Sequence, residues 1–237
     1  MSGTAVGEPQ TVTTSFRCEE CPYLRTAPYH GIEVRDFRVR SDRVAAGRTL
    51  QNQGEVAGRV FTLRTGWATR FVLLPDGRRQ ILDIYIPGDF ICYQLLVVRS
   101  AGFTVQTLSD ADLCEFDSRR MLDALRLTYG DTFGRWIEEQ FQRTDERLTD
   151  FGRRPAAERL VRFFLDLEHR LEVRGLVTDG SFEFPLRQEQ LADLVGMTVV
   201  HTGRLLSDLR NAKQLILERG RVRIQDHDAL RRLGGLG

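Results

Sequence analysis

Residues 185–210 read PLRQEQLADLVGMTVVHTGRLLSDLR, and the spacing of the apolar side chains predicts two short helices. The first helix covers 188–195, and Gly196 can end it in a tight turn. Thr198 can cap the second helix, because its hydroxyl accepts a hydrogen bond from a free backbone N–H. Two such helices can belong to any helical bundle, but the glycine turn and the capped second helix favour a helix-turn-helix.

A predicted hairpin follows the two helices. Residues 215–224 read LILERGRVRI, with Arg219-Gly220 at the turn between two apolar segments. A helix-turn-helix followed by a small β-hairpin is a winged-helix module, so we expect the C-terminal part to be a winged helix-turn-helix.

The region upstream of these helices is rich in short β-branched and aromatic segments. Five segments of this kind are VFTLRTG, ATRFVLL, QILDIYI, FTVQTL and ADLCEFD, all between residues 60 and 117. Asp76-Gly77 provides a hairpin turn between two of them. Many short strands at this spacing predict a β-barrel or a β-sandwich.

A long helix is predicted between these two regions, over residues 133–151. Its apolar stripe is narrow and has the spacing of a helix that pairs with a copy of itself. The alternative is a helix that packs on its own domain. The predicted dimerisation residues are Phe133, Ile137, Phe141, Thr144 and Leu148.

The whole chain, from about residue 17 to 233, resembles the CRP/FNR superfamily of bacterial transcription regulators. The most specific matches are DGRRQIL with PGDF, within residues 76–90, and RQEQLADLVGMT with GRLL, within 187–206. The resemblance implies an α+β chain: an N-terminal β-roll like a cyclic-nucleotide-binding jelly roll, a long dimerisation helix and a C-terminal winged helix-turn-helix. The expected divisions are an N-terminal extension with CxxC over 1–30, the sensor roll over 31–130, the dimerisation helix over 131–151 and the DNA-binding domain over 152–237.

The family also implies how DNA is bound: a homodimer on palindromic double-stranded DNA at promoters, with RNA polymerase as a further partner. Arg204 matches the position of a base-reading arginine, and arginine is the best bidentate partner for guanine. Val200 departs from the pattern, because many members have glutamate there, and valine cannot accept a bond from cytosine. The candidate DNA-binding residues are Arg187, Thr198, Val199, Val200, His201, Gly203 and Arg204.

The roll sequence does not predict cAMP as the signal. In the cyclic-nucleotide branch a glutamate holds the ribose and an arginine holds the phosphate, and neither motif is present in the matching run, residues 87–105. Arg99 is nearby but lacks the surrounding motif. The chain is therefore expected to be closer to the FNR-like branch.

The cysteines are the candidate sensor residues. Cys18 and Cys21 resemble part of the N-terminal cysteine cluster of FNR-type oxygen sensors, and Cys114 resembles the distal cysteine. The third N-terminal cysteine is missing, so Cys92 or His30 would have to supply a ligand. We expect a [4Fe–4S] cluster on Cys18, Cys21, Cys92 and Cys114, with zinc, other thiol chemistry or no metal as alternatives. Cys92 and Cys114 can equally be small buried apolar residues, and the protein would then answer to an organic ligand or to its own abundance.

Composition predicts a soluble globular protein of the cytoplasm, and no Ser-His-Asp set, phosphate loop or paired carboxylates indicate an enzyme. The chain is 41% hydrophobic and 28% charged with a net charge of +1, and it has no membrane-length apolar run and no recognisable signal peptide. A thiol oxidoreductase using Cys18 and Cys21 is the rival from another class. It is disfavoured because no thioredoxin-like pattern surrounds the pair.

Overall fold

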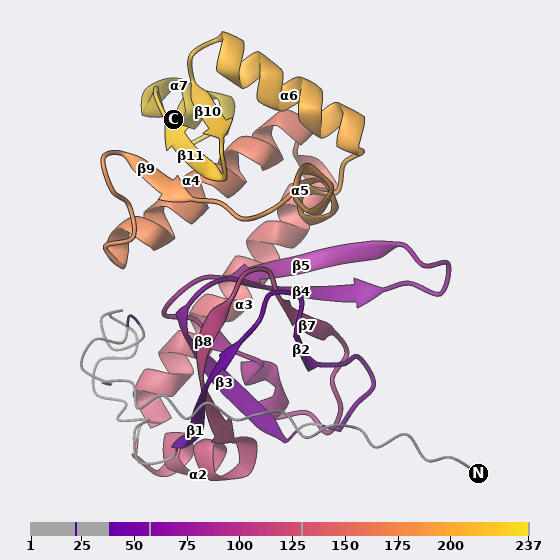
Figure 1. The fold of residues 1–237 in the computed structure, drawn as a ribbon, viewed down its shortest axis with the longest axis vertical. Helices are drawn as coiled ribbons and strands as arrows, with labels where there is room; N and C mark the ends of the chain where they lie inside the picture. Colours follow the sequence, from indigo (N-terminus) through magenta and orange to yellow (C-terminus); the bar gives the residue numbers. More distant parts are fainter. Residues whose placement is uncertain (1–21, 23–37, 57, 129, 237) are drawn as a thin grey trace.

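The computed structural model describes residues 22, 38–56, 58–128 and 130–236. A β-roll forms the lower half of the molecule in Figure 1 and a mixed domain forms the upper half, with the long helix α3 (Gly130–Arg153) leading from one to the other. The predicted α+β fold class is confirmed by this arrangement.

The roll consists of two four-stranded antiparallel sheets. One sheet has the order β1-β8-β3-β6 and the other has the order β2-β7-β4-β5. The strands are β1 (Arg38–Val44), β2 (Thr49–Gln51), β3 (Arg59–Thr65), β4 (Ala68–Leu73), β5 (Arg79–Tyr85), β6 (Phe90–Ile91), β7 (Thr104–Thr107) and β8 (Ala111–Asp117). All five predicted strands are present, whereas β1, β2 and β6 were not expected, because β1 is mostly polar and the other two are very short.

The predicted turn at Asp76-Gly77 joins β4 and β5 into a hairpin that projects from the body of the roll (Figure 1). The Leu74 N–H donates to the Arg78 carbonyl at 2.8 Å, and the Gly77 N–H donates to the Leu74 carbonyl at 2.9 Å. Gly77 has a φ of +83°, a conformation that glycine adopts at no steric cost.

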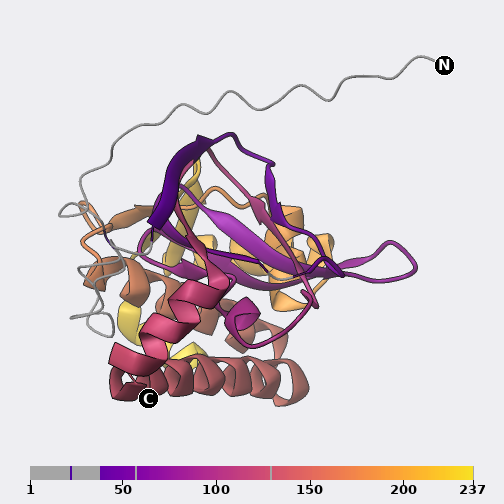
Figure 2. The same ribbon diagram turned by 90° about the horizontal axis from the view of Figure 1, so that it is seen from below.

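Two helices and a short 3₁₀ turn close the roll. The 3₁₀ turn η4 (Tyr93–Leu96) and helix α2 (Ser118–Thr128) pack on each other, and α2 also contacts α3 (Figure 2). Trp136 of α3 is buried in the core of the roll, and Phe133 and Ile137 pack against that core. The first part of the predicted dimerisation stripe therefore lies on its own domain, in line with the alternative considered for this helix.

The C-terminal domain has a three-stranded sheet, β10-β11-β9, and four helices. Its elements are α4 (Ala156–Val173), β9 (Ser181–Glu183), α5 (Gln188–Val195), α6 (Val199–Asn211), β10 (Leu215–Glu218), β11 (Arg221–Ile224) and α7 (His227–Leu233). Both helices of the predicted helix-turn-helix and the hairpin after them are present. Strand β9 and helix α7 were not expected.

The core of the C-terminal domain continues into the roll. Phe164, Phe182 and Leu191 belong to one buried apolar cluster with Trp67 and Ile84 of the roll. The two domains therefore share apolar surface, and their relative position is fixed in part by packing. None of the helices in the described part of the chain has the length and apolarity needed to cross a membrane.

Candidate functional site

The two helices of the helix-turn-helix meet at a turn built from Gly196 and Thr198. Gly196 ends α5 with a φ of +65°, in the left-handed region where a side chain is strained. Thr198 precedes α6, and its Oγ1 accepts a hydrogen bond from the His201 N–H at 3.2 Å. The predicted glycine turn and threonine cap are both present, and they fix where the second helix begins.

Gly203 lies on the side of α6 that faces the first residue of α5. A Cβ on Gly203 would lie 2.6 Å from the Nε2 of Gln188, which is shorter than any normal contact. The same Nε2 donates to the Val199 carbonyl at 2.9 Å. Gly203 is thus half-buried against α5 rather than free at the tip, and Gln188 is a positioning residue that the sequence patterns did not single out.

The first turns of α6 present a free surface. Val200 is 67% exposed, and Val199, His201 and Arg204 are also exposed, as is Arg187 just before α5. In Figure 1 this end of α6 is the right-hand end of the helix, next to α5. A helix end of this kind fits the major groove, where arginine can donate two hydrogen bonds to guanine and valine can touch a thymine methyl.

The hairpin after α6 turns tightly. Arg219 and Gly220 have φ values of +50° and +71°, the two successive positive values of a type I′ turn. On β11, Arg221 donates from Nη2 to the Ser181 Oγ at 2.9 Å, which ties the hairpin to β9. This third strand makes the wing a small sheet rather than a free hairpin.

The beginning of strand β5 binds the C-terminal domain at one point. Arg79 donates from Nη2 to the Asp193 carboxylate at 2.7 Å, and Gln80 donates from Nε2 to the Asp193 carbonyl at 2.6 Å. Asp193 lies on α5, so the β4–β5 hairpin binds the first helix of the helix-turn-helix. We call this contact the α5 mount.

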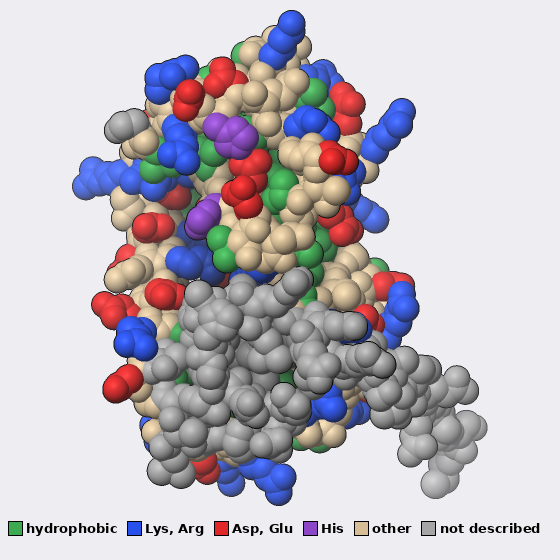
Figure 3. Space-filling model, turned by 90° about the vertical axis from the view of Figure 1, so that its left-hand side faces the viewer, with side chains coloured by type: hydrophobic (Ala, Val, Ile, Leu, Met, Phe, Trp, Pro, Cys, Tyr) green, Lys and Arg blue, Asp and Glu red, His purple; other side chains and the backbone are tan. Residues whose placement is uncertain are grey.

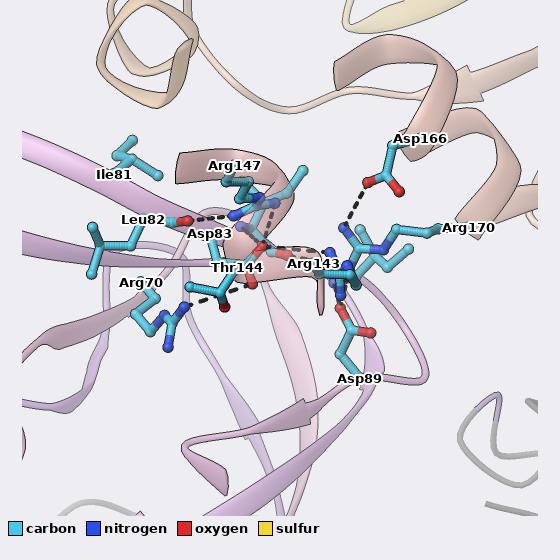
Figure 4. A network of polar contacts seen from close by, with 12 residues as sticks. Arg70, Ile81, Leu82, Asp83, Asp89, Arg143, Thr144, Arg147, Asp166 and Arg170 are labelled. Carbon is cyan, nitrogen blue, oxygen red and sulfur yellow. Dashed lines mark hydrogen bonds and ion pairs between the residues drawn. The ribbon is translucent and has the colours of Figure 1, made fainter. Parts of the chain in front are cut away.

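The turn after β5 holds the domain at a second point. The Asp89 carboxylate accepts from Arg170 Nη2 at 2.7 Å and from Arg174 Nη2 at 2.6 Å, and all three side chains are about nine-tenths buried. Arg170 and Arg174 lie on and just after α4, and the Asp89–Arg170 pair is visible in Figure 4. We call this contact the α4 mount. The roll residues of both mounts belong to the DGRRQIL and PGDF motifs. These motifs therefore attach the roll to the C-terminal domain.

A third charged group ties the roll to α3. Asp83 of β5 lies 2.8 Å from Arg147 Nη2 and 3.9 Å from Arg143 Nη2, with Arg70 on its other side (Figure 4). Burial alone would raise the pKa of Asp83, but the guanidinium groups of Arg147, Arg143 and Arg70 outweigh it and hold the pKa well below its usual value. Asp83 therefore stays ionised and binds the long helix to the roll.

The second half of α3 carries exposed apolar side chains. Phe141 is 68% exposed and Leu148 is 64% exposed, while Thr144 between them is also exposed. These three belong to the predicted dimerisation stripe. Phe151, one turn further on, is partly exposed and reaches the helix-turn-helix.

Charge on another face of the molecule is mixed. Figure 3 shows basic, acidic and histidine side chains interspersed on the C-terminal domain, on the side that faces left in Figure 1. The only lysine in the chain is Lys213, so almost all of the positive charge belongs to arginine. This face offers no continuous basic surface for a phosphate backbone.

The candidate cysteines separate into two groups. Cys18, Cys21 and His30 lie outside the described residues. Cys92 is fully buried in the roll, where burial raises the pKa of its thiol, and Cys114 is buried with its Sγ 3.9 Å from the Ser41 Oγ.

Cys92 and Cys114 lie at different places in the same half of the roll. Cys92 follows β6 and Cys114 is on β8, with β3 between them. Cluster ligands have to converge on one point as thiolates, and Cys18 and Cys21 lie outside the described residues, so the ligand set of four cysteines stays a prediction. No group of three or more metal-binding side chains occurs among the residues that the structure describes.

Comparison with known proteins agrees with this architecture. Residues 41–127 match the model of the cyclic nucleotide-binding domain, and residues 158–233 match the model of the Crp-like helix-turn-helix domain. The chain is 27% identical to the transcriptional activatory protein AadR of Rhodopseudomonas palustris, over 92% of this chain and 93% of that protein. It is 24% identical to the nitrogen fixation regulation protein FixK of Bradyrhizobium diazoefficiens, over 88% and 90%.

The fold is similar to that of solved regulators. The structure of FixK2 from Bradyrhizobium japonicum superposes with a TM-score of 0.73 at 21% identity, covering 81% of this chain and 96% of that one. A transcriptional regulator of the CRP family from Thermus thermophilus superposes with a TM-score of 0.64 at 24% identity, covering 82% and 96%. At these identities the structures establish the fold, and the curated relatives are regulators rather than enzymes.

Proposed function

Since the chain belongs to the CRP/FNR superfamily of DNA-binding transcription regulators, we propose that it binds a palindromic promoter site as a homodimer. The observation that carries this proposal is the exposed first part of α6, with Val200, His201 and Arg204 free of the rest of the protein. The exposed Phe141 and Leu148 of α3 support pairing with a second copy, because large apolar side chains in one stripe favour burial.

In this proposal Arg204 reads a guanine, while Arg187 and His201 contact phosphates or neighbouring bases. Thr198 caps α6, and Gly203 leaves room for the Gln188 side chain of α5. Base contacts provide specificity and phosphate contacts provide position and salt-dependent affinity. The protein would act in the cytoplasm, where the chromosome is, with RNA polymerase as its partner at the promoter.

The test is the substitution Arg204→Ala, with Arg210→Ala as a matched control. Both residues are exposed on α6, but Arg210 lies at the far end of the helix. A binding site is first selected from random DNA with the wild-type protein. Loss of one bidentate guanine contact costs about 1–3 kcal/mol per subunit, so Arg204→Ala should lose the selected site and keep weak binding to random DNA. Equal loss on both DNAs would refute the assignment.

We further propose that the regulator responds to redox state through Cys18 and Cys21. The pair has the spacing of a reactive or metal-binding dithiol, and the curated relatives include fumarate and nitrate reduction regulatory proteins. Cys114, on strand β8, is a further thiol of the same proposed sensor. An iron–sulfur cluster that also includes Cys92 stays a prediction, and the separation of Cys92 from Cys114 argues for a ligand set without Cys92.

Anaerobic purification with iron, sulfide and zinc analysis tests the form of this sensor. A cluster predicts brown protein with stoichiometric iron and sulfide, whereas a simple dithiol predicts colourless protein whose DNA affinity changes with oxidant. A Cys92→Ser variant should retain the metal if Cys92 is not a ligand. Colourless, metal-free protein whose DNA affinity is the same in oxidant and reductant would refute redox sensing in both forms.

A second candidate input is an organic ligand in the roll. Among the described residues, the Tyr85 hydroxyl and both polar atoms of the Gln94 side-chain amide are buried with no hydrogen-bond partner. Buried polar groups without partners are rare, and a ligand can supply the missing bonds. A thermal-shift screen of small polar metabolites, repeated on Gln94→Leu, would separate this candidate from redox sensing.

A further inference from the structure

Gly88 lies at the point where the α4 mount meets the N-terminal segment. It precedes Asp89 in the turn after β5 and has a φ of +95°. A Cβ at this position would lie 3.0 Å from the Arg174 Nε and 3.2 Å from the Pro22 carbonyl oxygen. The Pro22 carbonyl and the Arg174 guanidinium therefore both lie directly over the Gly88 backbone.

Pro22 is joined directly to Cys21. Consecutive Cα atoms are about 3.8 Å apart, so the contact of Pro22 with Gly88 is one residue away from the second cysteine of the CxxC pair. The segment around it, RCEECPYLR over residues 17–25, also carries the acidic pair Glu19-Glu20. The two glutamates stand between Arg17 and Arg25, so the segment has no net charge. Pro22 therefore connects a segment with two carboxylates to a point beside a buried guanidinium.

Arg174 has hydrogen-bonding capacity left over at this point. One of its nitrogens, Nη2, binds Asp89, while Nε and Nη1 are buried and have no hydrogen-bond partner among the described residues. The neighbouring Arg170 also has a buried Nε without a hydrogen-bond partner in the described part of the chain, while its Nη2 binds Asp89 and its Nη1 lies 3.9 Å from the Asp166 carboxylate. A buried guanidinium with N–H groups that bind nothing favours a further acceptor nearby.

We infer that the surface formed by Gly88 and Arg174 is the docking site of the segment of this chain that carries Cys18 and Cys21. The occupant is argued from the contact of Pro22 with Gly88, and its backbone carbonyls and the Glu19-Glu20 carboxylates are acceptors that the spare donors of Arg174 can bind. Because Arg174 also holds Asp89, the docked segment contacts the same group that fastens α4 to the roll. The N-terminal segment and the DNA-binding domain are thereby coupled, and such a coupling acts equally in both directions.

The inference adds to the proposed redox function a physical route from the cysteines to the DNA-binding domain. Docking does not depend on a redox response. Loss of the Arg174 guanidinium should free the segment that carries Cys18 and Cys21. Modifying the cysteines should in turn loosen the turn at Gly88-Asp89.

The first experiment measures the alkylation rates of Cys18 and Cys21 by mass spectrometry in the full-length reduced protein. Arg174→Gln should raise both rates by about three-fold or more, because the docked segment becomes freely accessible. Arg79→Gln is the matched control, since it breaks the α5 mount, which lies away from Pro22, and it should leave the rates at the wild-type value. Equal rates in all three proteins would overturn the docking site.

A second experiment needs no substitution in the mount. The reduced protein is labelled with a bulky maleimide, and hydrogen exchange is followed in peptides that cover the Gly88-Asp89 turn and the end of α4. Both peptides should exchange faster, by about three-fold or more, while the β4–β5 hairpin tip stays unchanged. Cys18→Ser/Cys21→Ser protein treated in the same way corrects for labelling at Cys92 and Cys114. Unchanged exchange at the turn would count against docking even if Arg174→Gln failed to fold.

The redox proposal and the docking site fail in different ways. If oxidant leaves wild-type DNA affinity unchanged while Arg174→Gln still frees the cysteines, redox sensing is refuted and docking stands. If oxidant changes DNA affinity but Arg174→Gln leaves alkylation unchanged, the signal reaches the DNA-binding domain by another route and docking is refuted.

Discussion

Phe151, near the end of α3, lies against Gly196, the glycine of the turn between α5 and α6. A Cβ on Gly196 would sit 2.7 Å from the Phe151 Cε1 atom. Arg159 covers the other side of this contact, with its guanidinium 5.9 Å from the centre of the Phe151 ring and its Nε donating to the Val195 carbonyl at 3.1 Å. The long helix therefore touches the helix-turn-helix at the turn that sets the direction of α6.

This contact predicts the effect of Gly196→Ala. The left-handed backbone costs alanine about 1–2 kcal/mol, and the clash with Phe151 adds about 1–3 kcal/mol. Urea unfolding should show both losses. Gly180→Ala is the control, because Gly180 has the same φ of +65° with nothing within 4 Å of its Cβ, so it should show only the backbone loss. Equal destabilisation of the two variants would mean that the Phe151 contact carries no energy.

Asp83 predicts how stability depends on pH. Its pKa is lower in the folded protein than in the unfolded chain, so its contribution is complete above about pH 4 and is lost as pH falls through the folded value. Wild-type unfolding free energy should therefore fall as the pH is lowered from about 4.

Asp83→Asn separates this group from the other carboxylates. The variant should be less stable at neutral pH by about 3–5 kcal/mol, because Arg147 and Arg143 lose a buried anion, and its stability should fall less steeply below pH 4. Asp179→Asn is the control, since Asp179 is an exposed turn residue and asparagine tolerates its positive φ. An acid profile of Asp83→Asn parallel to that of wild type would contradict the assignment.

Local patterns predicted most of the elements. The strands with alternating or continuous β-branched residues, the Asp76-Gly77 hairpin and the capped helix-turn-helix all depend on side chains close together in the sequence. Strand β1 reads RVRSDRV and was not predicted, because its polar residues are stabilised by pairing with β8, which follows it by some 70 residues.

The two mounts could not be predicted for the same reason. Asp89 is separated from Arg170 by 81 residues and Arg79 from Asp193 by 114, so no local period connects them. Gly203 was placed among the DNA-facing residues because it lies in the first part of α6. That it also faces the Gln188 side chain depends on how the two helices are placed in space, which the local pattern does not give.

The exposed stripe on α3 predicts the oligomeric state. Phe141→Glu combined with Leu148→Glu should convert the protein from dimer to monomer, as measured by sedimentation velocity at micromolar concentration. Burial of each side chain contributes about 1.5–3 kcal/mol, and charge in a dry interface opposes association further. Val173→Glu, an exposed apolar residue at the end of α4, is the control and should stay dimeric. A double variant that remains dimeric would place the interface elsewhere.

Val200 predicts a change of DNA preference. Val200 is exposed on the first turn of α6, where its methyl groups can touch thymine but cannot accept a hydrogen bond. Val200→Glu introduces an acceptor, so sites selected from random DNA should gain cytosine at one symmetric position in each half-site. The preference should be worth about 1–3 kcal/mol per half-site in competition anisotropy. The control is Val199→Glu, which adds the same charge at a neighbouring position and should weaken binding without enriching cytosine in the half-site. Identical selected sites from both variants and from wild type would show that this turn of α6 does not read bases.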